Sequence, residues 1–461
     1  MKEIKTFSLS LMQLLLALLV FACNKDKDDK NTPVLMYSVS GSVIDEFGRG
    51  MQGVKIYYSS SLYALTDSLG NWEIDDLSGE NSLAPSAEQY SFEPISYQVS
   101  AVEQNIVFSA ERVPSNTEAK IFNWMRAQQL PNGLLESAEY SNVASTYDNA
   151  LAAMCFLMIG EPERAERIFD FFDARIFSEL KSGPGGFSQL RSNTGVPNNH
   201  RWMGDNAWLL IALNNYKAMT GSAKYDFLSS EIATWLIGLQ DTDGGLFAGY
   251  DRNNNRLNYK VTEGMIDAFN AIEGYTAFHS NLLQFLEIDR WDATDGNLTA
   301  WPGNPPYLFA LDVFPWSYLI FEDYPVSALT SADRFLCSHT AINGVEITGY
   351  CFDEDKDVVW PEGTGQMTLA FHFAGRMAEK ELYLNELERI LLQNSDHPNA
   401  AGFPYATNMG TTYGPDPLWN GADTEIALSG GAWYLFTKFG FSPFAYGRSK
   451  NIPQADKFWL Q

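Results

Sequence analysis

The 461-residue sequence has little cysteine, histidine or positive charge. It holds four cysteines with no CxxC pair, and five histidines without HxxxH-type spacing, so we expect no zinc site, other metal or cofactor. Only 31 Lys and Arg stand against 57 Asp and Glu, giving a net charge of −26. Because so acidic a protein repels phosphate backbones, a nucleic-acid partner is excluded.

Long apolar runs are also missing, since none reaches the 18 residues or so of a membrane-spanning helix. What the sequence does have is an apolar fraction of 45% and an abundance of rings, with 12 Trp, 22 Tyr and 30 Phe. This composition excludes a disordered chain and suits the handling of carbohydrate. The length allows two or more domains with cores of their own.

The N-terminus predicts export. Lys2 and Lys5 precede a short apolar run that ends at Ala22, which indicates a signal peptide over residues 1–22. Val20-Phe21-Ala22-Cys23 resembles the lipobox of bacterial lipoproteins, which implies a lipid anchor at Cys23; an ordinary cleaved signal is the alternative. The polar tether at 23–36 resembles the export tag of Bacteroides-type surface lipoproteins, although a plain spacer has the same composition. We expect an outer-membrane lipoprotein that is surface-exposed or, alternatively, faces the periplasm.

Residues 37–112 alternate in the manner of short strands separated by Gly, Asp, Asn and Ser, which predicts a β-sandwich. The stretch from Gly41 to Asp45, the pair Gly53-Val54, and Thr66-Asp67 followed by Trp72 resemble the carboxypeptidase-regulatory-like domain. That resemblance implies a spacer or docking module.

Residues 113–446 predict a mainly α domain built from two alternating kinds of helix. Amphipathic helices are expected near 117–129, 162–172, 223–240, 281–291, 324–338 and 378–394. Helices apolar on every side, and therefore buried, alternate with them. Acids spaced 49 to 63 residues apart mark the starts of the buried helices: Asp148, Asp205, Glu263, Asp312, Glu362 and Glu425. Six buried helices inside six amphipathic ones predict an (α/α)6 toroid, followed by a C-terminal tail at 447–461.

The buried helices are preceded by glycine-containing loops, such as Gly185-Gly186-Phe187 and Ala401-Gly402-Phe403. Together with the helical repeat, they make the domain resemble the six-hairpin glycosidase superfamily. This resemblance implies an active site at the N-terminal ends of the inner helices. A first-turn acid also caps a helix or complements its dipole, so one such acid alone indicates little.

Glycoside hydrolysis needs two carboxyls, one protonated and one ionised. We assign the general acid to Glu263, with Asp267 one turn below it as a like-charged neighbour, and its partner to Asp205; Glu362 is a rival for either role. The other expected substrate contacts are Asp148, Asp267, Asp423, Glu425, Trp202, Tyr250, Trp360 and Trp419.

The predicted function is therefore a glycoside hydrolase acting on a poly- or oligosaccharide, as a monomer. A polysaccharide lyase using Tyr147 and Arg201 is the nearest alternative, and a non-catalytic glycan-binding lipoprotein is another. Pairing of Cys337 with Cys351 stays open, and the acidic run from Asp353 to Asp357 lacks the glycine of an EF-hand loop.

Overall fold

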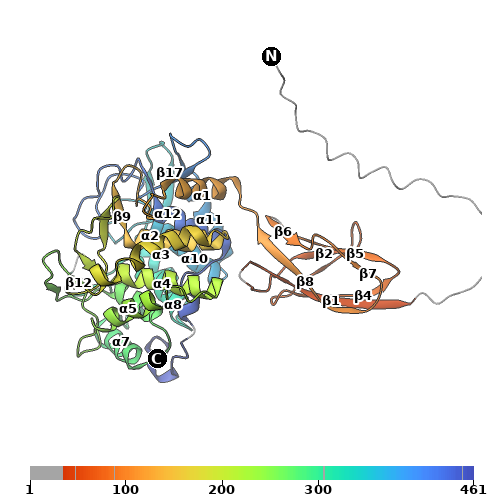
Figure 1. The fold of residues 1–461 in the computed structure, drawn as a ribbon, viewed down its shortest axis with the longest axis horizontal. Coiled ribbons are helices and arrows are strands. Elements are labelled where there is room, and N and C mark those ends of the chain that lie inside the picture. The colour runs from red at the N-terminus through yellow and green to blue at the C-terminus, as the bar shows by residue number, and fades with distance from the viewer. Residues whose placement is uncertain (1–34, 47, 88, 305–306, 449) are drawn as a thin grey trace, which may run out of the picture. The chain divides into compact units, whose positions relative to one another are not determined.

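The computed structural model describes residues 35–461, apart from 47, 88, 305–306 and 449 (Figure 1). The predicted signal peptide, the lipid anchor at Cys23 and most of the tether lie outside the described residues and stay predictions. The chain forms two compact units, with the boundary between Glu111 and Arg112. In the described part of the chain, no helix is both long and apolar enough to cross a membrane.

The smaller unit contains two four-stranded sheets, with orders β4-β1-β8-β6 and β3-β2-β5-β7. Alternate residues of the strands, among them Val39, Val43, Ile74 and Phe108, form its core. The strands are β1 (Met36–Ile44), β2 (Lys55–Tyr57), β3 (Tyr63–Leu65), β4 (Asn71–Ser78), β5 (Asn81–Ser86), β6 (Tyr90–Glu93), β7 (Tyr97–Val99) and β8 (Glu103–Arg112). Membership of the carboxypeptidase-regulatory-like family stays a prediction.

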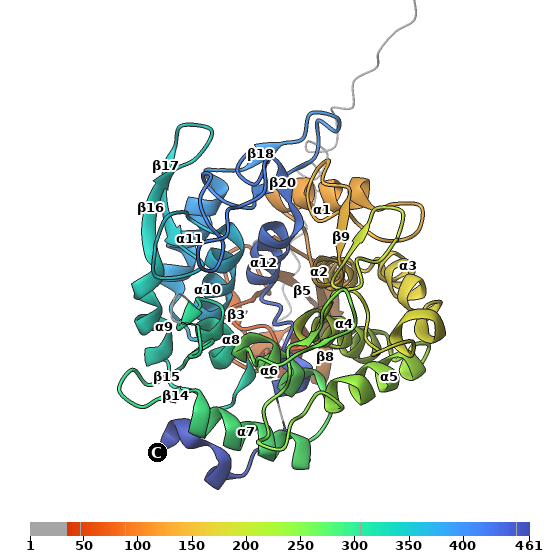
Figure 2. The ribbon, with the colours of Figure 1, turned by 90° about the vertical axis from the view of Figure 1, so that its left-hand side faces the viewer.

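The larger unit is helical with small sheets, and six of its helices form a closed inner ring (Figure 2). Each inner helix packs against the next, and the last packs against the first. They are α2 (Thr146–Met158), α4 (Met203–Thr220), α6 (Thr262–Ala271), α8 (Val313–Ile320), α10 (Pro361–Phe373) and α12 (Leu428–Phe439). The ring explains why these helices are apolar on every side, since neighbours cover both flanks.

A second set of helices surrounds the ring, and each of them packs against an inner helix. In α3, for example, Ile168, Phe169 and Phe172 are buried, and Pro162 starts the helix. The outer helices are α1 (Asn116–Gln128), α3 (Pro162–Asp173), α5 (Asp226–Ile237), α7 (Ala277–Asp289), α9 (Ser327–Ser331) and α11 (Met377–Glu388). This layering is that of an α/α toroid.

Two outer helices are shorter than predicted. The helix expected over 324–338 ends at Ser331, and β16 (Leu336–Thr340) then pairs with β17 (Glu346–Tyr350). The Asn343-Gly344 turn and the β-branched residues beside it favour this hairpin. The helix expected over 378–394 ends at Glu388.

Short strands and turns connect the helices. The strands are β9 (Val143–Ser145), β10 (Leu190–Ser192), β11 (Arg201–Trp202), β12 (Gly249–Tyr250), β13 (Arg256–Leu257), β14 (Trp291–Asp292), β15 (Asn297–Leu298), β18 (Leu392–Gln393), β19 (Ala401–Pro404) and β20 (Ile426–Ala427). A π-helical turn spans Ile176–Leu180, and 3-10 turns span Ala332–Phe335, Gln454–Asp456 and Phe458–Leu460.

The C-terminal segment, which includes α13 (Ala445–Arg448), packs onto the toroid. Trp459 is buried, with its ring 4.9 Å from that of Phe321. Cys155, Cys337 and Cys351 are free thiols.

Candidate active site

A cavity of about 910 Å³ opens at the N-terminal ends of the inner helices, and all six helices or their leading loops contribute to it. Its size lies within the ~300–1,000 Å³ typical of small-molecule sites. Seven carboxyl groups line it: Asp148, Asp205, Glu263, Asp267, Asp312, Glu362 and Glu425. All six acids that mark the sequence repeat therefore meet in one place.

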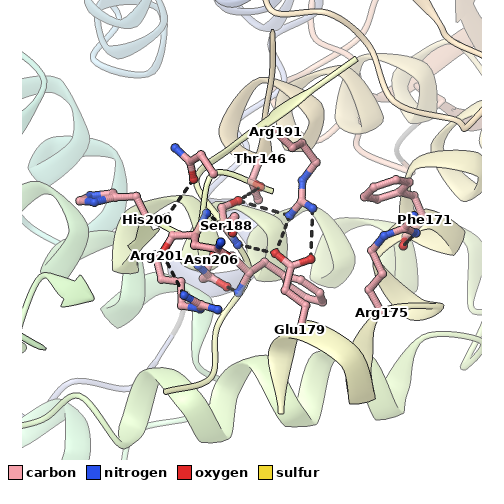
Figure 3. A network of polar contacts seen from close by, with 12 residues as sticks. Thr146, Phe171, Arg175, Glu179, Ser188, Arg191, His200, Arg201 and Asn206 are labelled. Atoms are coloured by element: carbon pink, nitrogen blue, oxygen red, sulfur yellow. Dashed lines mark hydrogen bonds and ion pairs between the residues drawn. The ribbon is translucent and has the colours of Figure 1, made fainter. Parts of the chain in front are cut away.

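A buried polar network connects the loop at Phe187 and Ser188 to the first turns of α2 and α4 (Figure 3). Arg191 is 2% exposed and forms an ion pair with Glu179 at 3.0 Å. Glu179 also accepts a hydrogen bond from the backbone N–H of Ser188, whose carbonyl accepts from the Thr146 hydroxyl. In α4, the side-chain amide of Asn206 donates a hydrogen bond to the backbone carbonyl of Trp202. These contacts fix the starts of α2 and α4, where two of the acids lie.

The first group of acids surrounds Tyr147. The Tyr147 hydroxyl donates to Oε1 of Glu362 at 2.6 Å, and its backbone N–H donates to Oδ1 of Asp205 at 3.2 Å. Burial raises the pKa of Asp148 to about 6, and the pKa values of Asp205 and Glu362 to about 7. Hydrogen bonds from Ser429 and Tyr147 oppose that rise in the pKa of Glu362.

The second group consists of Glu263, Asp267 and Asp312. Within the described structure, both oxygens of Glu263 and one oxygen each of Asp267 and Asp312 are buried without a hydrogen bond of normal geometry. Burial raises the pKa of Glu263 to about 7, against smaller lowering effects that include the nearby Tyr307 hydroxyl. Burial, and then the charges of neighbouring acids, hold the pKa values of Asp267 and Asp312 well above their usual range.

Aromatic rings cover much of the remaining cavity wall. Trp419 is 40% exposed, and its ring lies 4.3 Å from that of Tyr405. The other rings of the lining are Tyr140, Tyr147, Trp202, Trp208, Tyr307, Trp316, Trp360 and Tyr413. Among the lining residues that the structure describes, none is Lys, Arg or His. The cavity therefore combines flat apolar surfaces with carboxyl groups and has no cationic side chain in its described wall.

The cavity contains most of the residues predicted for the site: Glu263, Asp205, Glu362, Asp148, Asp267, Glu425, Trp202, Trp360 and Trp419. Two predicted contacts, Tyr250 and Asp423, are not among its lining residues. Tyr250 pairs with Arg201 across β11 and β12, whereas Gly249 pairs with Trp202. Because successive strand residues face opposite sides, Trp202 faces the cavity while Tyr250 and Arg201 face away.

Glu425 reaches the cavity from a different position than predicted. It does not open the last inner helix, because α12 begins at Leu428 and β20 lies between them. Asp423, two residues earlier, sits in the same turn region. Sequence reasoning gave Tyr307 and Gln189 no role, although both line the cavity, because neither belongs to the repeated acid pattern.

The spacing of Cys351, Asp355 and Asp357 would suit a cation, since their ligand atoms lie within 4.8 Å of one another. All three groups lie outside the cavity lining. Asp357 already accepts hydrogen bonds from the backbone N–H and the hydroxyl of Thr411. Hydrogen bonds from Thr411, which lies on a different loop, therefore account for the placement of these carboxylates.

No family model matches the chain, and no curated protein matches its sequence. Solved structures do match. A cellobiose 2-epimerase from Bacillus thermoamylovorans B4167 aligns at a TM-score of 0.51 and 10% identity, covering 70% of this chain and 97% of its own. A glycosidase aligns at 0.50 and 13% identity (70% and 95% covered), and an alpha-amylase from Clostridium perfringens at 0.50 and 12% (71% and 99%). The larger unit thus shares the toroid fold of these enzymes.

Proposed function

We propose that the chain hydrolyses a glycosidic bond in a poly- or oligosaccharide at this cavity. The observation that carries the proposal is a difference in hydrogen bonding among three buried carboxyls whose pKa values are all raised to about 7. Glu263 has no well-formed hydrogen bond in the described structure, whereas Asp205 and Glu362 accept them. A carboxyl with weaker hydrogen-bond donors favours its protonated form, and one with well-formed hydrogen bonds favours its ionised form. Glycoside hydrolysis uses one of each.

In this mechanism Glu263 is the general acid. It gives its proton to the leaving glycosidic oxygen as the bond to the anomeric carbon breaks. A carboxylate, Asp205 or Glu362, either removes a proton from the attacking water or attacks the anomeric carbon itself. Asp148, Asp267 and Glu425 accept hydrogen bonds from sugar hydroxyls, and Trp202, Trp360 and Trp419 stack on sugar faces.

The lining also favours a saccharide without negative charge. A lyase must neutralise the uronate carboxylate of its substrate, which needs a cation beside the base. Tyr147 lies in the cavity, but Arg201 does not, and the described lining offers seven carboxyls and no cationic side chain. A uronate there would meet only like charge. Hydrolysis is also compatible with the fold, which the chain shares with a glycosidase and an alpha-amylase.

The test is incubation of the purified full chain with a panel of neutral and acidic glycans. New reducing ends without the ultraviolet absorbance of an unsaturated uronate indicate hydrolysis, and that absorbance would indicate a lyase. Glu263→Gln should remove the activity, while Glu163→Gln, at an exposed position on α3, should retain it. Binding of a glycan without cleavage would replace the proposal with a glycan-binding role.

A further inference from the structure

One tyrosine connects four of the six inner helices. Tyr147 stands at the start of α2, and its hydroxyl donates to Glu362 of α10 at 2.6 Å. The same hydroxyl accepts a hydrogen bond from Nε1 of Trp433 in α12 at 2.9 Å. Its backbone N–H donates to Asp205 of α4. Both rivals for the ionised catalytic role are therefore bonded by this residue, but through different atoms.

The hydrogen bonds at the hydroxyl run in one direction. An indole N–H only donates, so the Tyr147 oxygen must accept from Trp433. The hydroxyl has one proton, and the 2.6 Å contact directs it to Glu362. A protonated Glu362 can still accept this bond through its carbonyl oxygen, but a hydrogen bond to an ionised carboxylate is stronger than one to a neutral carboxyl. The chain of donors thus favours the ionised form of Glu362.

We propose that Tyr147 is a positioning residue that holds Glu362 in its ionised form, with Glu263 as the acid. The proposal rests on the proposed hydrolysis and assigns Glu362, rather than Asp205, as the base or nucleophile. Trp433 acts through Tyr147, because its indole fixes the direction in which the hydroxyl donates.

Other groups also act on Glu362 and must stay constant in a test. Asp148 of α2 raises its pKa, and the Ser429 hydroxyl of α12 and Gln366 of α10 lower it. The charge of Glu362 in turn affects Asp312 and Tyr405. Replacement of Tyr147 leaves all of these groups in place.

Tyr147→Phe separates the two rivals. It removes the hydroxyl bonded to Glu362 but keeps the backbone N–H bonded to Asp205, and it keeps the ring that packs 5.1 Å from Trp208. Loss of one charge-assisted hydrogen bond should raise the pKa of Glu362 by about one unit. The acidic limb of the kcat/KM profile should move to higher pH by the same amount, because the base then ionises later. Trp433→Phe should cause a smaller shift in the same direction.

Tyr216→Phe is the matched control, since its hydroxyl also donates to a glutamate, Glu166, at 2.6 Å but outside the cavity. The first readout is carboxyl NMR of glutamate-labelled full-length protein, with the Glu362 signal identified by its loss in Glu362→Gln. The second is the pH profile on a hydrolysed substrate. A shift in both readouts for Tyr147→Phe, and in neither for Tyr216→Phe, supports the proposal.

Three results would overturn parts of it. An unchanged Glu362 signal would refute the positioning role. A shifted signal with an unchanged acidic limb would return the base role to Asp205. A shifted signal without hydrolysis of any glycan would refute the proposed function while leaving the positioning of Glu362 intact.

Discussion

Replacing Glu263 by glutamine should stabilise the folded protein at alkaline pH. Burial raises the pKa of Glu263 from 4.5 to about 7, so ionising it in the folded state is unfavourable. A difference of about 2.5 pKa units corresponds to about 3 kcal/mol. Glu263→Gln removes the ionisable proton and keeps the shape of the side chain, so it should remove this pH-dependent penalty.

The sign follows from proton linkage. At about pH 4 the carboxyl is protonated in both folded and unfolded states, and it adds no pH-dependent contribution. Between pH 4.5 and about 7 the unfolded chain releases the proton first, so the free energy of unfolding falls as pH rises. Above about pH 7 the penalty is complete. Relative to the wild type, the variant should therefore gain about 3 kcal/mol between about pH 4 and about pH 8.

Urea unfolding followed by circular dichroism of the helices measures this gain at each pH. The pH-dependent difference is the readout, because the cost of burying the glutamine amide is the same at every pH. Glu163→Gln, which removes an exposed carboxyl from α3, should give a difference that does not vary with pH. If Glu263→Gln and wild type differ by a constant amount across the range, the carboxyl is not a buried, poorly solvated charge, and the reasoning fails.

Three further outcomes follow from the geometry. Trp419→Ala should raise KM about tenfold with kcat little changed in saccharide kinetics, because it removes an exposed stacking ring. Gly363→Ala should lose about 2 kcal/mol in thermal melts, since its Cβ would lie 2.3 Å from the Trp360 ring, whereas Gly204→Ala, with 3.4 Å of room, should melt like wild type. Arg191→Ala should lose about 3–5 kcal/mol by urea unfolding, because it leaves a buried carboxylate unpaired.

The toroid and the meeting of its acids could be predicted because both depend on local patterns. Apolar helices must be covered on all sides, and an acid at the start of each one reaches the same end of the ring. Glu263 and Glu362 lie in the first turns of their helices as expected, and Asp312 immediately precedes α8. Local spacing therefore located the mouth of the cavity.

The remaining details depend on pairings that local patterns do not encode. Tyr147 and Glu362 are 215 residues apart, and they meet only because the ring closes. Trp433 is fully buried, as a core residue should be, yet its N–H reaches a residue of the cavity lining. Tyr250 faces away from the cavity because of the register in which β12 pairs with β11. That register depends on the partner strand, so the sequence around Tyr250 alone does not reveal which way its side chain faces.

Closure of the ring makes the site depend on both ends of the domain. The first inner helix supplies Tyr147, and the last supplies the indole that fixes its hydroxyl. A chain that stops just before Leu428 would contain five of the six inner helices and all seven carboxyls of the cavity. It would nevertheless lack the closing contact between α12 and α2. We therefore expect the proposed hydrolysis to require the complete domain, so that fragments lacking α12 show none of it.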